Sequence, residues 1–231
     1  MENPDLERLY PETNAKTLAM WETQDGIGSR RAPCYASGSF ALATGFQPEI
    51  AESVDVLFRE LQSLTCQDPL ADLQPRPGFH FTFVPLTLPL YEKNARLPVK
   101  THQLLDAWSP FAGQVITIRA LRLVALPGQL LLAGLPDSPA PAQRKAFCET
   151  LLTTHWQDEL WLRHDKTPLP APFWHTTLLR YQADYMPEPL RAFFRARQSL
   201  RFGDVCGSLD LRLVNYNWTY STPVTPGMIA S

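Results

Sequence analysis

A short pattern that occurs twice, 95 residues apart, limits what this chain can fold into more than any other feature. Each copy has a helical segment, a loop rich in proline, and then an apolar stretch that contains the tripeptide His-x-Thr. The two tripeptides begin at His80 and at His175. Residues such as Phe, Val and Thr favour strands, whereas proline ends regular structure. The repeat therefore predicts two related halves, each with its His-x-Thr on a β-strand.

The spacing of apolar residues predicts helices and strands around both copies. We expect an α+β fold, in which a bilobal duplicated body has antiparallel sheets lining a central groove and helices outside. Residues 1–33 are predicted to be a polar N-terminal extension with a short helical pattern at residues 15–21, and residues 34–231 a single bilobal domain. The predicted helices cover residues 48–64, 99–108, 141–156 and 187–197, and the predicted strands cover residues 35–43, 78–88, 114–125, 129–135, 173–181 and 208–216.

Charge and hydropathy exclude several classes of protein. The formal net charge of -2 argues against a large nucleic-acid surface, because such surfaces need many Lys and Arg side chains. The longest apolar stretch, residues 121–135, is interrupted by Pro127 and Gly128 and is too short to cross a membrane. The N-terminal sequence has no pattern of a secretory signal. We therefore expect a monomeric, cytoplasmic protein that does not associate with membranes.

The four cysteines are dispersed along the chain, at Cys34, Cys66, Cys148 and Cys206. None of them forms a C-x-x-C pair, so they are predicted to be reduced thiols and not ligands of zinc or members of a disulfide framework. His155 and His164 are nine residues apart, which on a continuous helix places them on nearly opposite faces. The sequence thus predicts neither a metal site nor a cofactor.

The residue types of the two tripeptides are suited to acid and base catalysis at a phosphate group. Side chains at positions i and i+2 of a strand share a face, so His80 is displayed beside Thr82, and His175 beside Thr177. An imidazole titrates near neutrality, so two of them can serve as base and acid at one phosphorus atom. The hydroxyl groups can donate hydrogen bonds to the non-bridging oxygens as charge develops.

This arrangement resembles the two-histidine (2H) phosphoesterases, which carry paired H-x-[ST]-x motifs on duplicated lobes. The resemblance covers roughly residues 35–216. It implies that His80 and His175 are the catalytic acid and base and that Thr82 and Thr177 hold the phosphate. The relatives include cyclic nucleotide phosphodiesterases, 2′,5′-linked RNA ligase-like proteins and RNA-end trimming enzymes. Thr176 departs from the family, which usually has an apolar residue at this middle position.

Aromatic and basic residues near the second motif are candidates for further contacts with the substrate. Trp174 and Tyr181 are predicted to stack on a nucleobase, with membership of an ordinary core as the alternative. Arg180 is a candidate for a distal phosphate, with a solvated surface position as its alternative.

The sequence therefore predicts a metal-independent phosphodiesterase that acts on a small nucleotide or an RNA end, including cyclic phosphodiesters. Two alternatives remain open at this point. The first alternative is a catalytically idle module that binds a nucleotide. The second is a hydrolase of a phosphodiester that is not a nucleotide.

Overall fold

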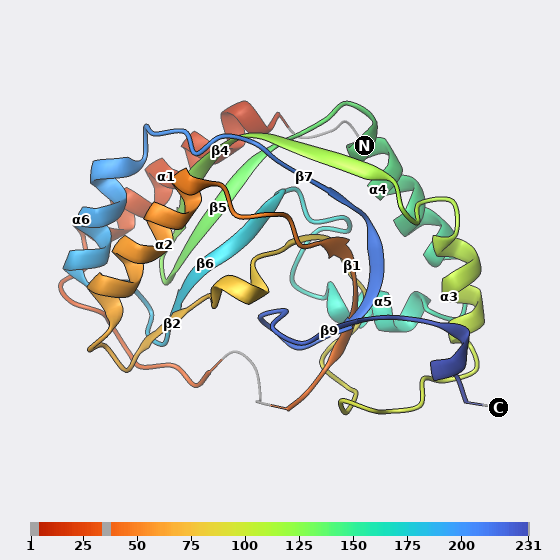
Figure 1. The fold of residues 1–231 in the computed structure, drawn as a ribbon. Helices are drawn as coiled ribbons and strands as arrows, with labels where there is room; N and C mark the ends of the chain where they lie inside the picture. The colour runs from red at the N-terminus through yellow and green to blue at the C-terminus, as the bar shows by residue number, and fades with distance from the viewer. Residues whose placement is uncertain (1–4, 34–37, 231) are drawn as a thin grey trace.

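The computed structural model describes residues 5–33 and 38–230 (Figure 1). The fold is α+β: two antiparallel sheets face each other across a central cavity, and helices lie outside them. The predicted strand at residues 35–43 lies partly outside the described residues, and its last three residues belong to β1 (Ala41–Phe46). The fold class expected from the sequence is confirmed.

The first His-x-Thr lies in a four-stranded sheet with the order β3-β1-β8-β9. His80 directly precedes β3, and Thr82 lies within it. The neighbouring strand β1 pairs with β3 on one side and with β8 on the other. The strands that join β1 are β3 (Phe81–Pro85), β8 (Asp210–Val214) and β9 (Ser221–Pro223).

The second His-x-Thr opens β6 in a five-stranded sheet with the order β2-β6-β5-β4-β7. Strands β4 and β5 form the hairpin predicted around Pro127 and Gly128. The short strands β2 and β7 were not predicted, because three or four residues give too little periodicity to recognise. The strands of this sheet are β2 (Ala71–Leu73), β4 (Val115–Leu126), β5 (Gln129–Pro136), β6 (His175–Tyr181) and β7 (Val205–Ser208).

The helices cover the outer faces of the two sheets (Figure 1). Helices α1, α2 and α6 lie on the side of the five-stranded sheet, and α3, α4 and α5 lie on the side of the four-stranded sheet. In the described residues, no helix combines the length and the apolar character needed to cross a bilayer. The bounds are α1 (Leu6–Glu22), α2 (Glu52–Thr65), α3 (Thr101–Trp108), α4 (Pro139–Leu151), α5 (Gln157–Arg163) and α6 (Glu188–Arg197), with single 3-10 turns at Arg76–Gly78 and Pro226–Met228.

The two halves repeat one arrangement around their motifs. In each half a strand leads through helical structure to the motif strand, which pairs antiparallel with it, as β1 does with β3 and β5 with β6. Both pairs also have a register shift directly after the motif threonine, which leaves Phe83 and Leu178 as the extra residues. A bulge bends a strand and re-aims its side chains. The repeat seen in the sequence thus extends to the irregularities of the strands.

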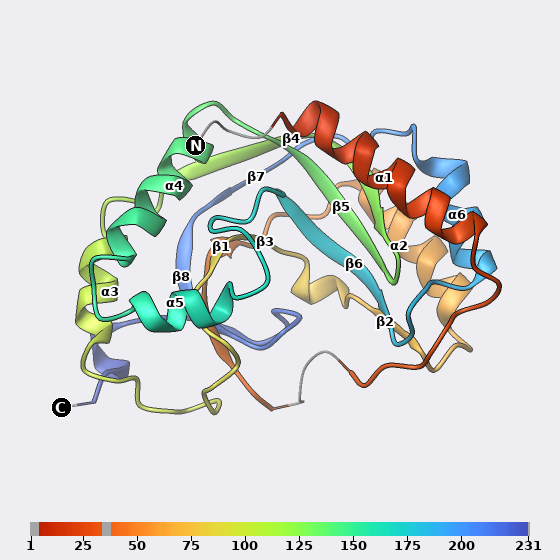
Figure 2. The ribbon, with the colours of Figure 1, turned by 180° about the vertical axis from the view of Figure 1, so that it is seen from behind.

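Helix α1 is longer than the pattern at residues 15–21 predicted, and it runs along β4 (Figure 2). Its buried stripe includes the polar residues Asn14 and Thr17. These side chains bond the backbone of Leu123 and Ala125 in β4, beyond the point where β7 pairs with that strand. An unpaired strand edge needs such partners. The sequence signal was weak because two positions of the buried stripe are polar.

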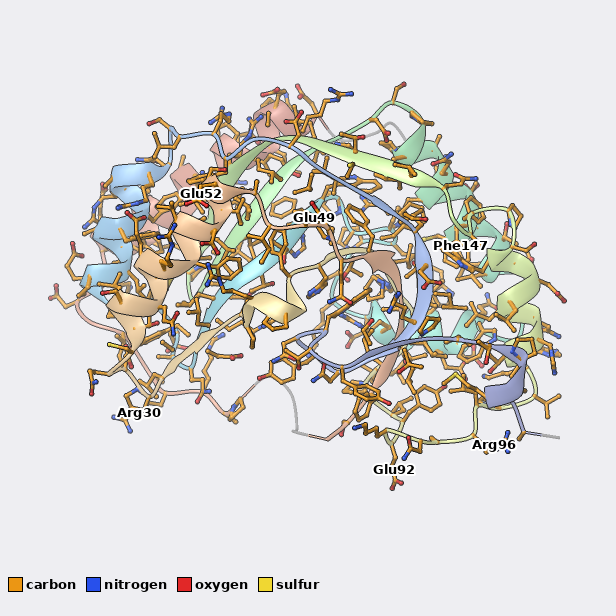
Figure 3. All side chains as sticks on the ribbon, in the orientation of Figure 1. Arg30, Glu49, Glu52, Glu92, Arg96 and Phe147 are labelled. Carbon is orange, nitrogen blue, oxygen red and sulfur yellow. The ribbon has the colours of Figure 1, made fainter. Side chains whose placement is uncertain are left out.

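An aromatic cluster fills the space between α3, α4 and the sheets. Phe83 lies 5.9 Å from Trp174 and 6.3 Å from Phe147, measured between ring centroids. Trp108 of α3 completes the cluster, 5.1 Å from Phe147. Figure 3 labels Phe147 beside α4, whereas the exposed Glu92 and Arg96 project from the edge of the molecule. This cluster fixes the bulged residue of β3 and so the strand that carries the first motif.

Candidate active site

The two motifs meet at a cavity of about 450 Å³ between the sheets, a volume within the range of small-molecule sites. His80, Thr82, His175 and Thr177 all line it. The two imidazoles therefore face one space, as an acid and a base that act on one phosphorus atom must.

The ring of His80 is held from two sides. Its Nδ1 lies 2.7 Å from the carbonyl oxygen of Gly78, and its face stacks on the ring of Trp218, with 4.6 Å between centroids and 6° between planes. A carbonyl only accepts, so Nδ1 carries the proton. In the neutral ring Nε2 then has the free lone pair, which is the state that a general base requires.

Gly78 is fixed by its own surroundings. A Cβ at this position would lie 1.9 Å from the carbonyl oxygen of Asn217, so only glycine fits. The buried Gln74 joins the two segments, because its Nε2 donates to the carbonyls of Gly78 (2.7 Å) and Asn217 (2.6 Å). The carbonyl that orients His80 thus belongs to a network that also holds the turn carrying Trp218.

The surroundings of His175 are different. The carbonyl of Phe173 is close enough to raise its pKa, yet these atoms do not meet hydrogen-bond geometry, and Nδ1 has no hydrogen bond within the described residues. The ring of Phe173 meets the imidazole edge-on at 6.1 Å. Arg144 of α4 also acts on His175, because its positive charge lowers the pKa of the imidazole. No aromatic stack comparable to that of Trp218 is present on His175 in the described residues.

Burial lowers the pKa of both histidines, to about 3 for His80 and to about 4 for His175. The charged form loses its hydration in the site, and Arg180 adds to the effect on both rings. Both imidazoles are therefore neutral at pH 7 in the empty site. A bound anion would raise both pKa values, since it favours the protonated ring.

The motif threonines and the residue between the second pair differ in exposure. Thr82 and Thr177 line the cavity, where their hydroxyl groups are available to a phosphate. Thr176 is 1% exposed, and its hydroxyl makes no hydrogen bond with any described residue. The polar middle residue of the second motif thus neither bonds the backbone nor indicates a wet strand face.

The charge of the cavity is positive. Arg144, Arg163 and Arg180 line it, and no carboxylate does so among the described residues. The chain as a whole has a formal net charge of -2, so this concentration of cations is local. A cavity lined by one sign of charge attracts ligands of the opposite sign. The arrangement therefore fits an anionic ligand.

The structure does not bring Trp174 and Tyr181 to the cavity lining. Trp174 directly precedes β6 and faces the core, at 2% exposed, where Arg144 stacks on its ring at 3.9 Å. Tyr181 would share a face with His175 in a regular strand, but the extra residue Leu178 reverses the alternation. Arg180 consequently lines the cavity instead.

Several lining residues were not predicted from the sequence. Arg144 and Arg163 come from α4 and α5, and His164 ends α5, where its Nε2 lies 3.0 Å from the carbonyl of Pro85. The helix expected to continue through residue 156 ends at Leu151, and α5 starts after a turn, so His155 and His164 do not share a helix. Only tertiary contacts bring these residues to the cavity, and no local pattern marks them.

The described residues contain no group of three or more His, Cys, Asp or Glu side chains arranged to hold a metal ion.

No family model matches the chain. No curated protein matches it either. A solved structure of a conserved protein of unknown function from Agrobacterium tumefaciens is similar in fold, with a TM-score of 0.48 and 13% identity over 88% of this chain and 94% of the other.

Proposed function

We propose that this protein is a phosphodiesterase that acts on a nucleotide or RNA-end phosphodiester, including cyclic ones, by two-histidine acid and base catalysis without a metal ion. One observation carries the proposal: both His-x-Thr pairs line one cavity that also presents three arginines and no carboxylate among the described residues. Such a cavity combines proton transfer groups with a field that favours a phosphate. The proposal agrees with the resemblance to the 2H phosphoesterases.

In the proposed mechanism, one histidine takes a proton from water or a ribose hydroxyl, and the other gives a proton to the departing oxygen. The hydroxyls of Thr82 and Thr177 donate hydrogen bonds to the non-bridging oxygens, where negative charge increases in the transition state. Arg180 supports the same charge, because its guanidinium lines the cavity and its positive charge lowers the pKa of both histidines.

In the productive state one of the two imidazoles is protonated and acts as the acid, while the other is neutral and acts as the base. In the empty site both imidazoles are neutral above about pH 5, because burial lowers their pKa to about 3 and about 4. The negative charge of a bound phosphodiester opposes this effect and favours uptake of one proton. Binding and protonation are therefore coupled, and the substrate supplies part of the electrostatic environment in which it reacts.

Aromatic residues support a nucleotide as the substrate. Phe173, Tyr216 and Trp218 line the cavity, and the guanidinium of Arg180 lies 5.7 Å from the ring of Tyr216. Aromatic faces beside cations are suited to bases and phosphates. We further propose a monomer in the cytoplasm, a location with which the free thiols of Cys66, Cys148 and Cys206 agree. Cys34 lies outside the described residues.

A panel of substrates in the presence of a chelator tests the proposal. It contains cyclic mononucleotides, cyclic oligonucleotides, 2′,5′-linked oligomers and a glycerophosphodiester. Turnover of a nucleotide that is lost in His175→Ala supports the proposal. Binding of nucleotides without turnover of any compound would identify an idle binding module, and turnover of the glycerophosphodiester alone would identify a hydrolase outside the nucleotides.

A further inference from the structure

The arginines of the cavity are not distributed evenly. Arg180 lies on β6 and has a carboxylate near it, since its Nη1 is 3.9 Å from Asp72. Arg144 of α4 and Arg163 of α5 line the cavity from the helical side, together with Thr167. We call these three residues, Arg144, Arg163 and Thr167, the helical wall.

Arg144 is a buried cation, 5% exposed. Its two terminal nitrogens donate to the carbonyls of Phe173 (3.2 Å) and Pro172 (3.3 Å), while its buried Nε has no hydrogen bond within the described residues. No described carboxylate forms an ion pair with it. Arginine is almost never fully buried without a partner for its charge. These contacts hold the loop before His175, and the guanidinium also stacks on the ring of Trp174, but no described carboxylate neutralises its charge.

Arg163 is half-buried at the end of α5. Its side chain makes no ion pair or hydrogen bond with any described residue, although it lines the cavity. Thr167 donates its hydroxyl to Nδ1 of His164 (3.2 Å), because Nε2 of this ring donates to the carbonyl of Pro85. Two cations without carboxylate partners among the described residues thus line this side of the cavity. Cations that line a cavity without carboxylate partners favour an anion there.

The helical wall and Arg180 line the cavity from different elements. Arg180 lies on β6, three residues after the motif threonine Thr177. Arg144 is, after burial, the largest influence on the pKa of His175. Its side chain bonds the loop that precedes His175. The helical wall therefore borders the His175 side of the site.

We propose that the helical wall binds a second phosphate group of the substrate, next to the phosphodiester that is cleaved. The inference rests on the proposed function and narrows the substrate class to phosphodiesters that carry a further phosphate on the side of His175. A phosphate fits the wall because guanidinium groups bind its oxygens in a planar, forked geometry.

The direct test is a binding measurement that needs no turnover. Calorimetry compares thymidine 3′,5′-bisphosphate with thymidine 5′-monophosphate on the wild-type protein. We expect the bisphosphate to bind about tenfold more tightly, as one charge-assisted contact would give. Equal affinities would overturn the inference.

Variants assign any preference to the wall. Arg163→Gln changes a side chain with no described polar partner, so the fold should persist, and the preference for the bisphosphate should fall to about twofold or less. Arg144→Gln should act in the same direction. Arg201→Gln is the matched control, because the side chain of this exposed arginine bonds, among the described residues, only the neighbouring carbonyls of Ser199 and Leu200. If Arg163→Gln keeps the tenfold preference for the bisphosphate, the second phosphate does not bind at the helical wall. This conclusion holds even if Arg144→Gln fails to fold.

Turnover distinguishes failure of this inference from failure of the proposed function. The 5′-p-nitrophenyl ester of thymidine monophosphate is assayed with and without a 3′-phosphate. Cleavage of both esters at equal kcat/KM would retain the phosphodiesterase and remove the second phosphate site. Cleavage of neither ester, with the binding preference intact, would retain the phosphate site and count against the phosphodiesterase.

Discussion

The two catalytic candidates stand in equivalent places but in different surroundings. His80 is bonded at Nδ1 to the carbonyl of Gly78 and stacked on Trp218. His175 has the corresponding carbonyl, that of Phe173, out of bonding geometry, and it has the cation of Arg144 beside it. The repeated motif thus fixes where each imidazole is, whereas distant parts of the chain decide how each one is held.

This difference has a clear origin in the sequence. The i, i+2 spacing and the bulge after the threonine are local properties of each motif strand, and both halves have them. Trp218 comes from the turn between β8 and β9, and Arg144 comes from α4. Because these neighbours are not repeated, the two rings are free to serve different roles at one phosphate. Substitutions in the two halves should therefore have unequal effects wherever they change these neighbours.

The largest effect is expected from removing either imidazole. His80→Ala and His175→Ala should each lower kcat by roughly 10² to 10⁴, because one acid or base is lost. Steady-state turnover of a nucleotide diester measures this. His102→Ala, which changes an exposed residue of α3, is the control and should leave kcat unchanged. Near-normal turnover in either variant, with its fold intact, would exclude that histidine from catalysis.

The threonines should matter somewhat less and more equally. Thr82→Val and Thr177→Val should each lower kcat by roughly 10- to 100-fold, because one donor to the non-bridging oxygens is lost. The position of the pH optimum should stay the same, since a hydroxyl does not titrate near neutrality. Thr176→Val is the matched control, because its hydroxyl is buried without a described partner and its loss should not reduce kcat. A shifted pH optimum in Thr82→Val would contradict a role limited to binding.

The stack on His80 sharpens the comparison of the halves. Trp218→Leu should lower kcat about tenfold by loosening the imidazole, whereas Phe173→Leu, which removes only an edge contact from His175, should cost less. Trp218→Phe should restore most of the activity, because a flat ring remains. The pH profile of Trp218→Leu should also change, which a merely destabilised protein would not show. Equal losses in the two leucine variants would remove the proposed asymmetry.

The smallest predicted effect is a displacement between two pH profiles. Both should be bell-shaped, with pKa values that belong to the pair of histidines and not to one ring. The pKa values of the free protein lie near 3 and 4, so the optimum of kcat/KM should be acidic. The bound phosphodiester raises both pKa values, so the optimum of kcat should lie at higher pH. If kcat and kcat/KM have the same pH optimum, the charge of the bound substrate does not raise the pKa values of the two histidines.

The sequence predicts the architecture and the core of the site because both depend on local periodicity. The four motif residues meet as the alternation of strands requires, and most predicted helices and strands are present within a few residues. Helix α1 was underestimated because Asn14 and Thr17 occupy positions that are normally apolar. Here a polar side chain replaces a missing strand neighbour, which only the sheet topology reveals.

The remainder of the site depends on features that a single sequence does not display. A bulge after Thr177 exchanges the faces of Arg180 and Tyr181, and nothing in the residues around Leu178 indicates it. In the sequence, Arg144 and Arg163 resemble any other arginine of an amphipathic helix. Only the tertiary structure brings them to the cavity, where Arg144 bonds the loop before His175. A single sequence therefore does not reveal the side chains that reach a site only through tertiary contacts.

The most direct test of the central claim is the turnover of a nucleotide phosphodiester in an excess of chelator. If His80 and His175 transfer protons, the chelator leaves the rate of the wild-type protein unchanged, and each His→Ala variant is slower by roughly 10² to 10⁴ under the same conditions. If the rate instead disappears with chelator and returns with a divalent ion, the histidines are metal ligands and the two-histidine acid and base mechanism is wrong.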